Sequence, residues 1–386
     1  MKKLTLSRIL NLFILGLLAL CWSSLALAAR TPMPSPPPVS GQAHVLMEYH
    51  SGDILAQSDA DEPREPASLT KLMTAYVAFS ALEDGAVSLD DQITVSERAW
   101  RMAGSRMFIE VNTRVSLREL LKGMIIQSGN DASVAIAEHV GGSEESFVQM
   151  MNATAASLGM HNSHFANSTG MPDPMQLVTA RDIAILARAL IRDFPDNYGW
   201  YSQREYSYNG IRQHNRNRLL WRDDSVDGLK TGYTSSAGYS LVSSAKRNDM
   251  RLISVVLGAR GDQSRVSDSQ SLLNYGFRFF ESHQLYAAGE ELTRTRVWRG
   301  ARDSVGLGVR EDLRVTVPRG RYESLDAYMD LESAVAAPVG MDQQVGVVRV
   351  TLDDEVISER PLYPLEAVDE GGLIRRLFDD IRLWFM

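Results

Sequence analysis

Between residues 42 and 282, strand signals stand near both ends of the segment and helix signals fill the middle. The helical stretches are marked by apolar residues that recur three and four positions apart. Opening strands, a helical middle and returning strands predict an α+β domain in which an antiparallel sheet carries helices. The predicted strands are 43–49, 54–56, 239–244 and 251–257, and the predicted helices are 68–82, 117–127, 131–140, 144–158, 179–193 and 267–280.

The segments that flank this region differ from it in composition and in sequence pattern. Residues 29–41 are rich in proline, which predicts a stiff, extended linker. Residues 283–365 alternate short β-rich runs with turns, so we expect a small all-β domain there. Its predicted strands are 294–298, 313–317, 346–352 and 355–358.

Residues 1–28 have the three-part order of a secretory signal peptide. A basic start is followed by an apolar run over residues 9–20 and then by Ala26-x-Ala28, which fits a signal-peptidase site. The alternative is a transmembrane anchor, but the run is short for a bilayer span and ends in small residues. Cys21 follows Leu20, where a lipoprotein site needs a small residue. We therefore expect export to the periplasm with cleavage after Ala28.

Residues 366–386 predict a hinge and an amphipathic helix. A Gly371-Gly372 pair precedes a segment whose apolar side chains cover roughly 140° of a helical wheel. The alternative is a helix that packs into a core, but the aromatic-rich apolar face favours a helix lying in a membrane interface. We expect a peripheral anchor on the outer face of the inner membrane. The apolar set is Leu373, Ile374, Leu377, Phe378, Ile381, Trp384 and Phe385.

Composition excludes several kinds of function. The 386 residues carry 40 Lys and Arg against 48 Asp and Glu, a net charge of −8, which argues against a nucleic-acid-binding surface. The single cysteine allows neither a disulfide framework nor a cysteine-based zinc site. His161 and His164 are three residues apart, but no third ligand stands near them in sequence. Phosphate-binding glycine loops are absent. We expect no metal and no cofactor, and no oligomeric state is predicted.

The first motif that could carry chemistry is Ser68-Leu69-Thr70-Lys71, which follows Pro66. Proline favours a helix start, so Ser68 is expected in the first turn, with Lys71 on the same face. A nucleophilic serine needs a base, and a lysine of depressed pKa can serve. Taken alone, the pattern is also that of a surface serine and lysine.

Two further motifs follow at long intervals. Ser128-Gly129-Asn130 ends an apolar helical stretch, where a hydroxyl could shuttle a proton and an amide could hold a substrate, although the same letters can be a helix-terminating turn. Lys230-Thr231-Gly232 comes directly before the strand at 239–244 and would offer a cation and a hydroxyl to an anion. Gly232 would let a substrate backbone approach the strand edge.

Taken together, S-x-x-K, S-x-N and K-T-G in this order resemble the penicillin-recognising serine enzymes. Further stretches make the chain similar to the low-molecular-mass penicillin-binding proteins, the D-alanyl-D-alanine carboxypeptidases of types five and six. The resemblance covers the whole mature chain and implies a transpeptidase/β-lactamase-like catalytic domain over residues 42–282, a β-rich domain over 283–365 and a terminal anchor. The stretches that carry it are 104–109, 123–132, 215–217, 226–232 and 275–280.

The resemblance implies a role for each motif residue in removing the terminal D-alanine from peptidoglycan pentapeptides. Ser68 would attack the carbonyl and Lys71 would accept its proton, while Lys230 would help to keep Lys71 neutral by like-charge repulsion and would add to the electropositive site. Ser128 would pass a proton to the leaving D-alanine, and Asn130 would hold the substrate amide. β-Lactams would acylate the same serine.

The remaining implied residues bind the substrate. Thr231 and Arg265 would hold the terminal carboxylate, and Arg216 would help to shape the pocket. The backbone N–H groups of Ser68 and Tyr233 would form the oxyanion hole.

The chain departs from the family pattern at Tyr233, where many members have histidine, and at residues 175–178, where relatives often carry basic or aromatic residues. The oxyanion role needs only the backbone of Tyr233, whereas a side-chain role there is put in doubt. The alternatives are a D,D-endopeptidase, a weak β-lactamase on the same fold, and, from another class, a non-catalytic wall-binding scaffold. Neither the role of the β-rich domain nor the physiological task among paralogues follows from the sequence.

Overall fold

The computed structural model describes residues 33–384, with the side chain of Leu383 excepted. The predicted signal peptide therefore lies outside the described residues. Within them, five strands form one antiparallel sheet in the order β2-β1-β9-β8-β7. The hairpin of β1 and β2 opens the domain, and the three late strands complete the sheet. The strands are β1 (Ala43–Glu48), β2 (Ile54–Ser58), β7 (Val226–Thr234), β8 (Gly238–Arg247) and β9 (Met250–Ala259).

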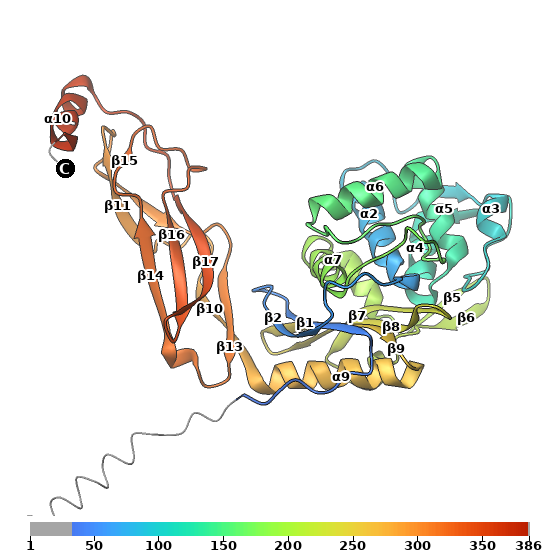
Figure 1. Ribbon diagram of the computed structural model, residues 1–386. Helices are drawn as coiled ribbons and strands as arrows, with labels where there is room; N and C mark the ends of the chain where they lie inside the picture. The colour runs from blue at the N-terminus through green and yellow to red at the C-terminus, as the bar shows by residue number, and fades with distance from the viewer. Residues whose placement is uncertain (1–32, 385–386) are drawn as a thin grey trace, which may run out of the picture. The chain divides into compact units, whose positions relative to one another are not determined.

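Helices cover both faces of this sheet (Figure 1). One face packs against α9 (Asp262–Phe279), with Leu252, Val256 and Leu272 in the shared core. The other face packs against α7 (Ala180–Asp193) beneath a layer of further helices. These two layers confirm the predicted α+β class with an antiparallel sheet that carries helices.

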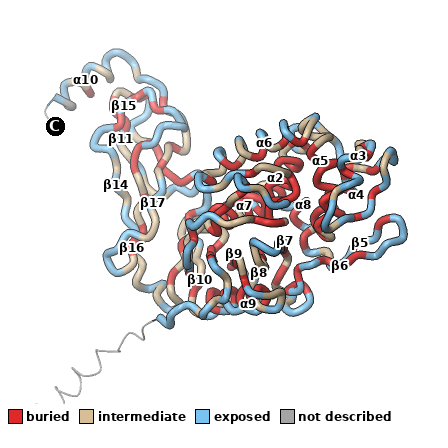
Figure 2. The backbone as a smooth tube through the Cα atoms, turned by 45° about the vertical axis from the view of Figure 1, so that its right-hand side comes forward, coloured by how far each residue is buried: buried red, intermediate tan, exposed pale blue. Residues whose placement is uncertain are grey.

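The helical layer is built around α2 (Lys71–Glu83), most of whose side chains are buried because the helix contacts α5, α6 and α7. Its buried path is visible in Figure 2. The surrounding helices are α3 (Glu97–Trp100), α4 (Leu117–Lys122), α5 (Asn130–Gly141), α6 (Glu144–Ser157) and α8 (Pro195–Tyr198). Two strand pairs had no sequence prediction: β3 (Gln92–Thr94) pairs with β4 (Arg114–Ser116) around α3, and β5 (Glu205–Tyr208) pairs with β6 (Ile211–His214) after α8.

Two predicted helices near the site described below have different bounds, and one strand there was missed. The helix expected over 117–127 is α-helical only to Lys122 and continues as a π-turn over Gly123–Gln127. The helix expected from 267 begins at Asp262. The prediction missed this start because the first turn, Asp262 to Arg265, is polar and shows no apolar periodicity. Lys230-Thr231-Gly232 precedes strand β8 as expected, but the motif itself lies in the edge strand β7, which had no sequence prediction.

The β-rich part has its own core of valine and leucine side chains. A two-stranded sheet pairs β10 (Phe280–Tyr286) with β13 (Leu313–Pro318), and a six-stranded sheet has the order β14-β16-β17-β12-β11-β15. All four predicted runs are strands, whereas β10, β12, β14 and β15 had no sequence prediction. The six strands are β11 (Thr293–Trp298), β12 (Ser304–Gly308), β14 (Leu325–Leu331), β15 (Val335–Ala336), β16 (Gly346–Leu352) and β17 (Glu355–Pro364).

Helix α10 (Leu373–Leu383) uses its polar face for packing and leaves its apolar face open. Asp379 is buried and accepts hydrogen bonds from the Arg299 backbone N–H at 2.8 Å and from Arg296 at 3.3 Å. Leu373 and Trp384 are 82% and 90% exposed, and Figure 2 shows the helix largely in the exposed colour. The alternative of a core-packing helix is therefore wrong for this segment. Across residues 33–384, no helix has both the length and the hydropathy to cross a bilayer.

Candidate active site

Ser68 lies in a 3-10 turn, Ala67–Thr70, that leads directly into α2. Ala67 has a left-handed backbone with φ of 47°, which is costly for a residue with a side chain and is found mainly where the surrounding structure imposes it. A Cβ on Gly170 would lie 1.8 Å from the Ala67 carbonyl oxygen, and one on Gly232 would lie 2.9 Å from that of Pro66. Glycine at both positions therefore lets two distant segments close tightly around the serine turn. The space that a side chain at Gly232 would fill is therefore occupied by the serine turn of the protein itself, rather than kept free for a substrate backbone.

Lys71 is 1% exposed, and its Nζ has three polar neighbours. They are Ser68 Oγ at 3.2 Å, Asn130 Oδ1 at 2.7 Å and the carbonyl oxygen of Thr169 at 2.5 Å. The Asn130 amide is oriented by its other end, because Nδ2 donates to the Ala103 carbonyl at 2.7 Å. Two of the three neighbours can therefore only accept hydrogen bonds.

This arrangement decides where the lone pair of a neutral Lys71 points. A neutral amine has two N–H groups, and the Asn130 and Thr169 oxygens accept both of them. The lone pair then faces the remaining neighbour, the Ser68 hydroxyl, which can donate its proton. Burial lowers the pKa of Lys71 to about 7, with Asp131 opposing the shift and the Arg216 guanidinium adding to it. A lysine in this setting can act as a base near neutral pH.

Lys230 is also buried, and its Nζ donates to Ser128 Oγ at 2.8 Å and to the Thr231 carbonyl at 3.1 Å. Burial drives the pKa of Lys230 well below its usual value, and the charges of Lys71, Arg216 and Arg265 lower it further. Desolvation is the main cause of the lowered pKa of both lysines, and the like-charge repulsion between them adds to the lowering at Lys230.

Ser128 and Asn130 take their positions from the break between two helices. Ser128 is left-handed, with φ of 70°, and ends the π-turn, after which Asn130 begins α5. The Asp131 carboxylate then accepts the backbone N–H groups of Met107 at 3.0 Å and Phe108 at 2.9 Å. Asn130 Nδ2 also donates to the Ala103 carbonyl in the loop that precedes Met107. Together these hydrogen bonds hold that loop beside Ser128.

The motif residues line one cavity of about 390 Å³. Thr231 is buried in β7, whereas Tyr233 is 53% exposed at the edge of the cavity and stacks on Tyr239 with ring centroids 4.3 Å apart. All ten residues expected at the site lie in or directly beside this cavity, although Lys71 and Lys230 lie behind its surface. The lining residues are Ser68, Gly104, Ser105, Ser128, Asn130, Thr169, Gly170, Met171, Arg216, Thr231, Gly232, Tyr233, Thr234 and Arg265.

Arg265 reaches the cavity from the first turn of α9 and is already hydrogen-bonded. One of its nitrogens donates to the Gly232 carbonyl at 2.9 Å and to the Ser240 carbonyl at 3.2 Å, and another pairs with Asp262. The guanidinium is therefore fixed against the end of β7, and its orientation depends on Asp262. A planar cation held in this way can bind a carboxylate.

The sequence reasoning missed the segment Asn167–Gly170, which supplies the Thr169 carbonyl. A backbone acceptor leaves no signature in the side-chain pattern, although the Asn-x-x-Gly turn at 167–170 was a signal for a tight backbone conformation. The structure contains no group of three or more His, Cys, Asp or Glu side chains within its described part that could hold a metal ion.

Comparisons with known proteins match both parts of the chain. A family described as D-alanyl-D-alanine carboxypeptidase matches residues 30–261, and one described as penicillin-binding protein 5, C-terminal domain, matches residues 280–370. The carboxypeptidases DacC and DacA of Escherichia coli K12 are 45% and 41% identical to this chain, covering 90% and 92% of it and 89% and 90% of their own lengths. The crystal structure of penicillin-binding protein 5 from Haemophilus influenzae is 41% identical, covers 87% of this chain and all of its own, and superposes with a TM-score of 0.84.

Proposed function

This chain belongs to the D-alanyl-D-alanine carboxypeptidase family, and we propose that its reaction proceeds through an acyl-enzyme on Ser68. It is a serine-type carboxypeptidase, a hydrolase of cell-wall peptides. The observation that carries the proposal is the set of contacts at Lys71, in which two strict acceptors leave the lone pair for the Ser68 hydroxyl.

Acylation begins when Ser68 Oγ attacks the carbonyl carbon between the two terminal D-alanines. The hydroxyl proton passes to Lys71 Nζ, while the carbonyl oxygen gains the negative charge of the tetrahedral intermediate. The backbone N–H groups of Ser68 and Tyr233 bind that charge, and each such donor contributes about 3 kcal/mol to transition-state stabilisation.

Collapse of the intermediate breaks the peptide bond, and the leaving D-alanine nitrogen needs a proton. Ser128 Oγ delivers it and regains a proton from Lys230, whose Nζ lies 2.8 Å away. The proton that Lys71 took from Ser68 passes on to Lys230, so Lys71 is neutral again. Water then attacks the ester carbon while neutral Lys71 takes one of its protons, and Lys71 returns that proton to Ser68 Oγ as the ester bond breaks, which leaves the carboxylate product and the free serine hydroxyl. A β-lactam enters the same cycle, and its amide bond is the one that Ser68 opens.

Substrate binding falls to the residues around the nucleophile. Asn130 holds the substrate amide, the edge of β7 lines the cavity at Gly232, and Tyr233 contributes its backbone. Thr231 and Arg265 bind the terminal carboxylate, while Arg216 adds positive charge to the wall of the cavity. The D-Ala-D-Ala terminus of a stem pentapeptide has the single negative charge that this set of groups suits.

Replacing Arg265 by alanine tests the carboxylate site. The variant should raise KM for a D-Ala-D-Ala peptide by about tenfold or more, the loss expected for one charge-assisted hydrogen-bonded pair. Acylation by a penicillin ester, which has no carboxylate, should slow much less. Steady-state kinetics with the peptide and labelling kinetics with the ester measure the two effects, and equal losses on both would reject the role.

The predicted leader and the open apolar face of α10 support a periplasmic enzyme held on the outer face of the inner membrane. Six apolar side chains of the tail are at least half exposed, and they share one side of the helix. The carboxypeptidase part would then work on peptidoglycan close to the membrane.

Removal of residues 371–386 should release the mature protein from membranes. The truncated chain is expected in the supernatant after sedimentation with vesicles of bacterial lipids, while the intact chain pellets. The variant Leu377→Asp with Phe378→Asp keeps the tail length and should also be released. Sedimentation of the truncated chain with the vesicles, as for the intact protein, would show that another surface binds the membrane.

The carboxypeptidase assay is incubation of the mature protein with a D-Ala-D-Ala pentapeptide and measurement of free D-alanine. A D,D-endopeptidase would instead release linked peptides from cross-linked muropeptides, and a β-lactamase would turn over penicillin without lasting label. A scaffold would do none of these. The described serine–lysine geometry favours catalysis over the scaffold.

A further inference from the structure

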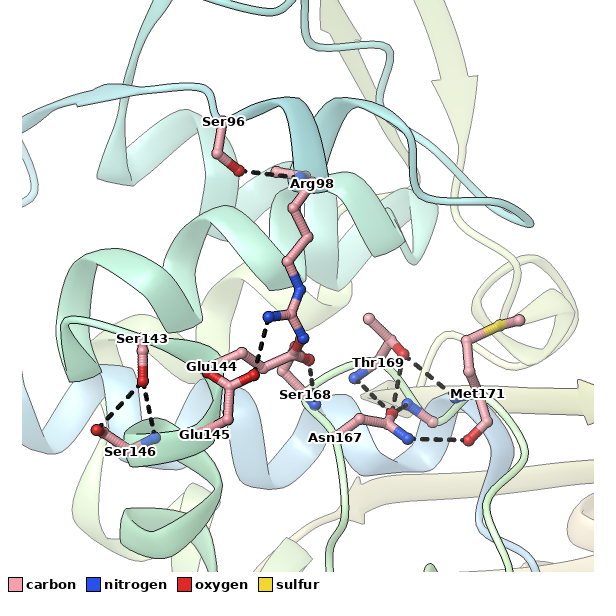
Figure 3. Close-up of polar contacts among 12 residues, drawn as sticks. Ser96, Arg98, Ser143, Glu144, Glu145, Ser146, Asn167, Ser168, Thr169 and Met171 are labelled. Atoms are coloured by element: carbon pink, nitrogen blue, oxygen red, sulfur yellow. Dashed lines mark hydrogen bonds and ion pairs between the residues drawn. The ribbon is translucent and has the colours of Figure 1, made fainter.

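Glu144 is a buried carboxylate that the proposed reaction does not use. It is the first residue of α6 and is 6% exposed. One oxygen accepts the backbone N–H of Ser168 at 3.0 Å and the Ser168 hydroxyl at 2.7 Å, and the other oxygen accepts from Arg98 at 2.6 Å (Figure 3). Glu144 therefore links a surface arginine to the segment that carries the Thr169 carbonyl.

The same segment is held from two further sides. Asn167 Oδ1 accepts the backbone N–H groups of Thr169 at 3.2 Å and of Gly170 at 2.8 Å, as Figure 3 shows. Thr74, one turn along α2 from Lys71, donates its hydroxyl to the Ser168 carbonyl at 2.7 Å. The backbone polar groups on both sides of Thr169 are thus engaged, and its carbonyl remains directed at Lys71.

We propose that Glu144 is a positioning residue for the general base: by holding Ser168 it fixes the Thr169 carbonyl that orients Lys71. This inference rests on the proposed function, in which Lys71 takes the proton of Ser68. If the carbonyl moved, one N–H of neutral Lys71 would lose its strict acceptor and could turn toward Ser68 Oγ. The lone pair would then no longer face the serine proton.

The chain offers a matched control for this role. Glu145 pairs with the same Arg98 at 2.9 Å, but its side chain is 69% exposed. Both glutamates lie in the first turn of α6, so both interact with the helix dipole. Each variant loses one negative charge and one contact with Arg98, whereas loss of the tie to Ser168 is specific to Glu144.

The experiment compares Glu144→Ala, Glu144→Gln and Glu145→Ala in the full mature chain. The rate of acylation by a fluorescent penicillin is measured from pH 5 to 9, together with kcat and KM for the pentapeptide. Glu144→Ala should slow acylation by up to roughly 100-fold, the cost of a small misplacement of a reacting group, with little change in KM. Glu144→Gln should recover most of the rate, because its amide oxygen can still accept from Ser168, and Glu145→Ala should match the wild type.

The pH profile separates positioning from a general loss of structure. A carbonyl oxygen beside an ammonium stabilises the charged form, so its displacement in Glu144→Ala should move the midpoint of the profile to lower pH. The other charges that face Lys71, which are those of Asp131, Arg216 and Lys230, are unchanged in all three variants.

Two outcomes overturn the inference. Glu144→Ala and Glu145→Ala could acylate at the same rate with the same midpoint, or Glu144→Gln could be as slow as Glu144→Ala. If Glu144→Ala does not fold, Ser168→Ala replaces it, since this variant removes only the 2.7 Å hydroxyl contact and should give a smaller loss with a smaller shift of the midpoint in the same direction. Normal kinetics in Ser168→Ala would then reject the role. Failure of the proposed function has another signature, namely wild-type acylation in Lys71→Met.

Discussion

Replacing Ser68 by alanine should abolish covalent labelling by a fluorescent penicillin and reduce D-alanine release by at least about 10⁴-fold, because no other group can form the acyl-enzyme. The fold should survive, since the change removes one oxygen at the surface of a cavity. Labelling is read by gel fluorescence and the label is located by peptide mapping.

Ser80→Ala is the matched control for this experiment. Ser80 stands on the same helix as Lys71, and its hydroxyl donates to the Tyr76 carbonyl at 3.0 Å within that helix. This variant should label and turn over as the wild type does. Persistent labelling of Ser68→Ala at another residue would show that the nucleophile has been misassigned.

Replacing Lys71 by methionine should slow acylation by about 10²- to 10⁴-fold, the usual contribution of a general base. Methionine keeps an unbranched side chain at this buried position, but its thioether sulfur is not basic enough to accept the Ser68 proton. Binding of the substrate depends on other groups, so KM should change little. Stopped-flow labelling and steady-state kinetics measure the two quantities.

The role of Lys71 as the base also predicts the direction in which the acylation rate changes with pH. Burial lowers the pKa of Lys71 to about 7, so the neutral, basic form is lost below that pH and gained above it. Wild-type acylation should therefore rise as the pH increases through about 7, whereas the residual rate of Lys71→Met should show no rise there. A wild-type profile that falls across this interval would exclude Lys71 as the base.

The nature of the site was readable from the sequence, but its internal contacts were not. The i, i+3 spacing of Ser68 and Lys71 puts both on one helical face, so their proximity followed from local geometry. Lys71 and Asn130 are 59 residues apart, and Ser128 and Lys230 are 102 apart. Only the packing of α2, α5 and β7 around one cavity brings these pairs to hydrogen-bond distance.

The acceptor at Thr169 and the tie through Glu144 could not be found in advance. Every residue has a carbonyl, so the one that faces Lys71 is selected by backbone path rather than by residue type. Glu144 looked like an ordinary acidic residue in a first helical turn, a place where acidic residues are favoured for the dipole alone. Its burial against Ser168 depends on where a distant loop returns.

For the C-terminal helix, too, the sequence predicted one property and the tertiary structure decided another. Its periodicity alone indicated an amphipathic helix, because apolar positions at helical spacing determine a face whatever the rest of the chain does. The tertiary structure decided which face packs against the rest of the chain. It is the polar face, because Asp379 accepts hydrogen bonds from Arg296 and Arg299.

Local rules thus determined the element types, the α+β class and the motif residues, since spacing and residue chemistry act over a few neighbouring positions. The tertiary structure decided the desolvation of Lys71 and Lys230, the orientation of Arg265 and the aim of the Thr169 carbonyl. These properties depend on burial and on distances between residues far apart in the chain, and sequence spacing does not specify either.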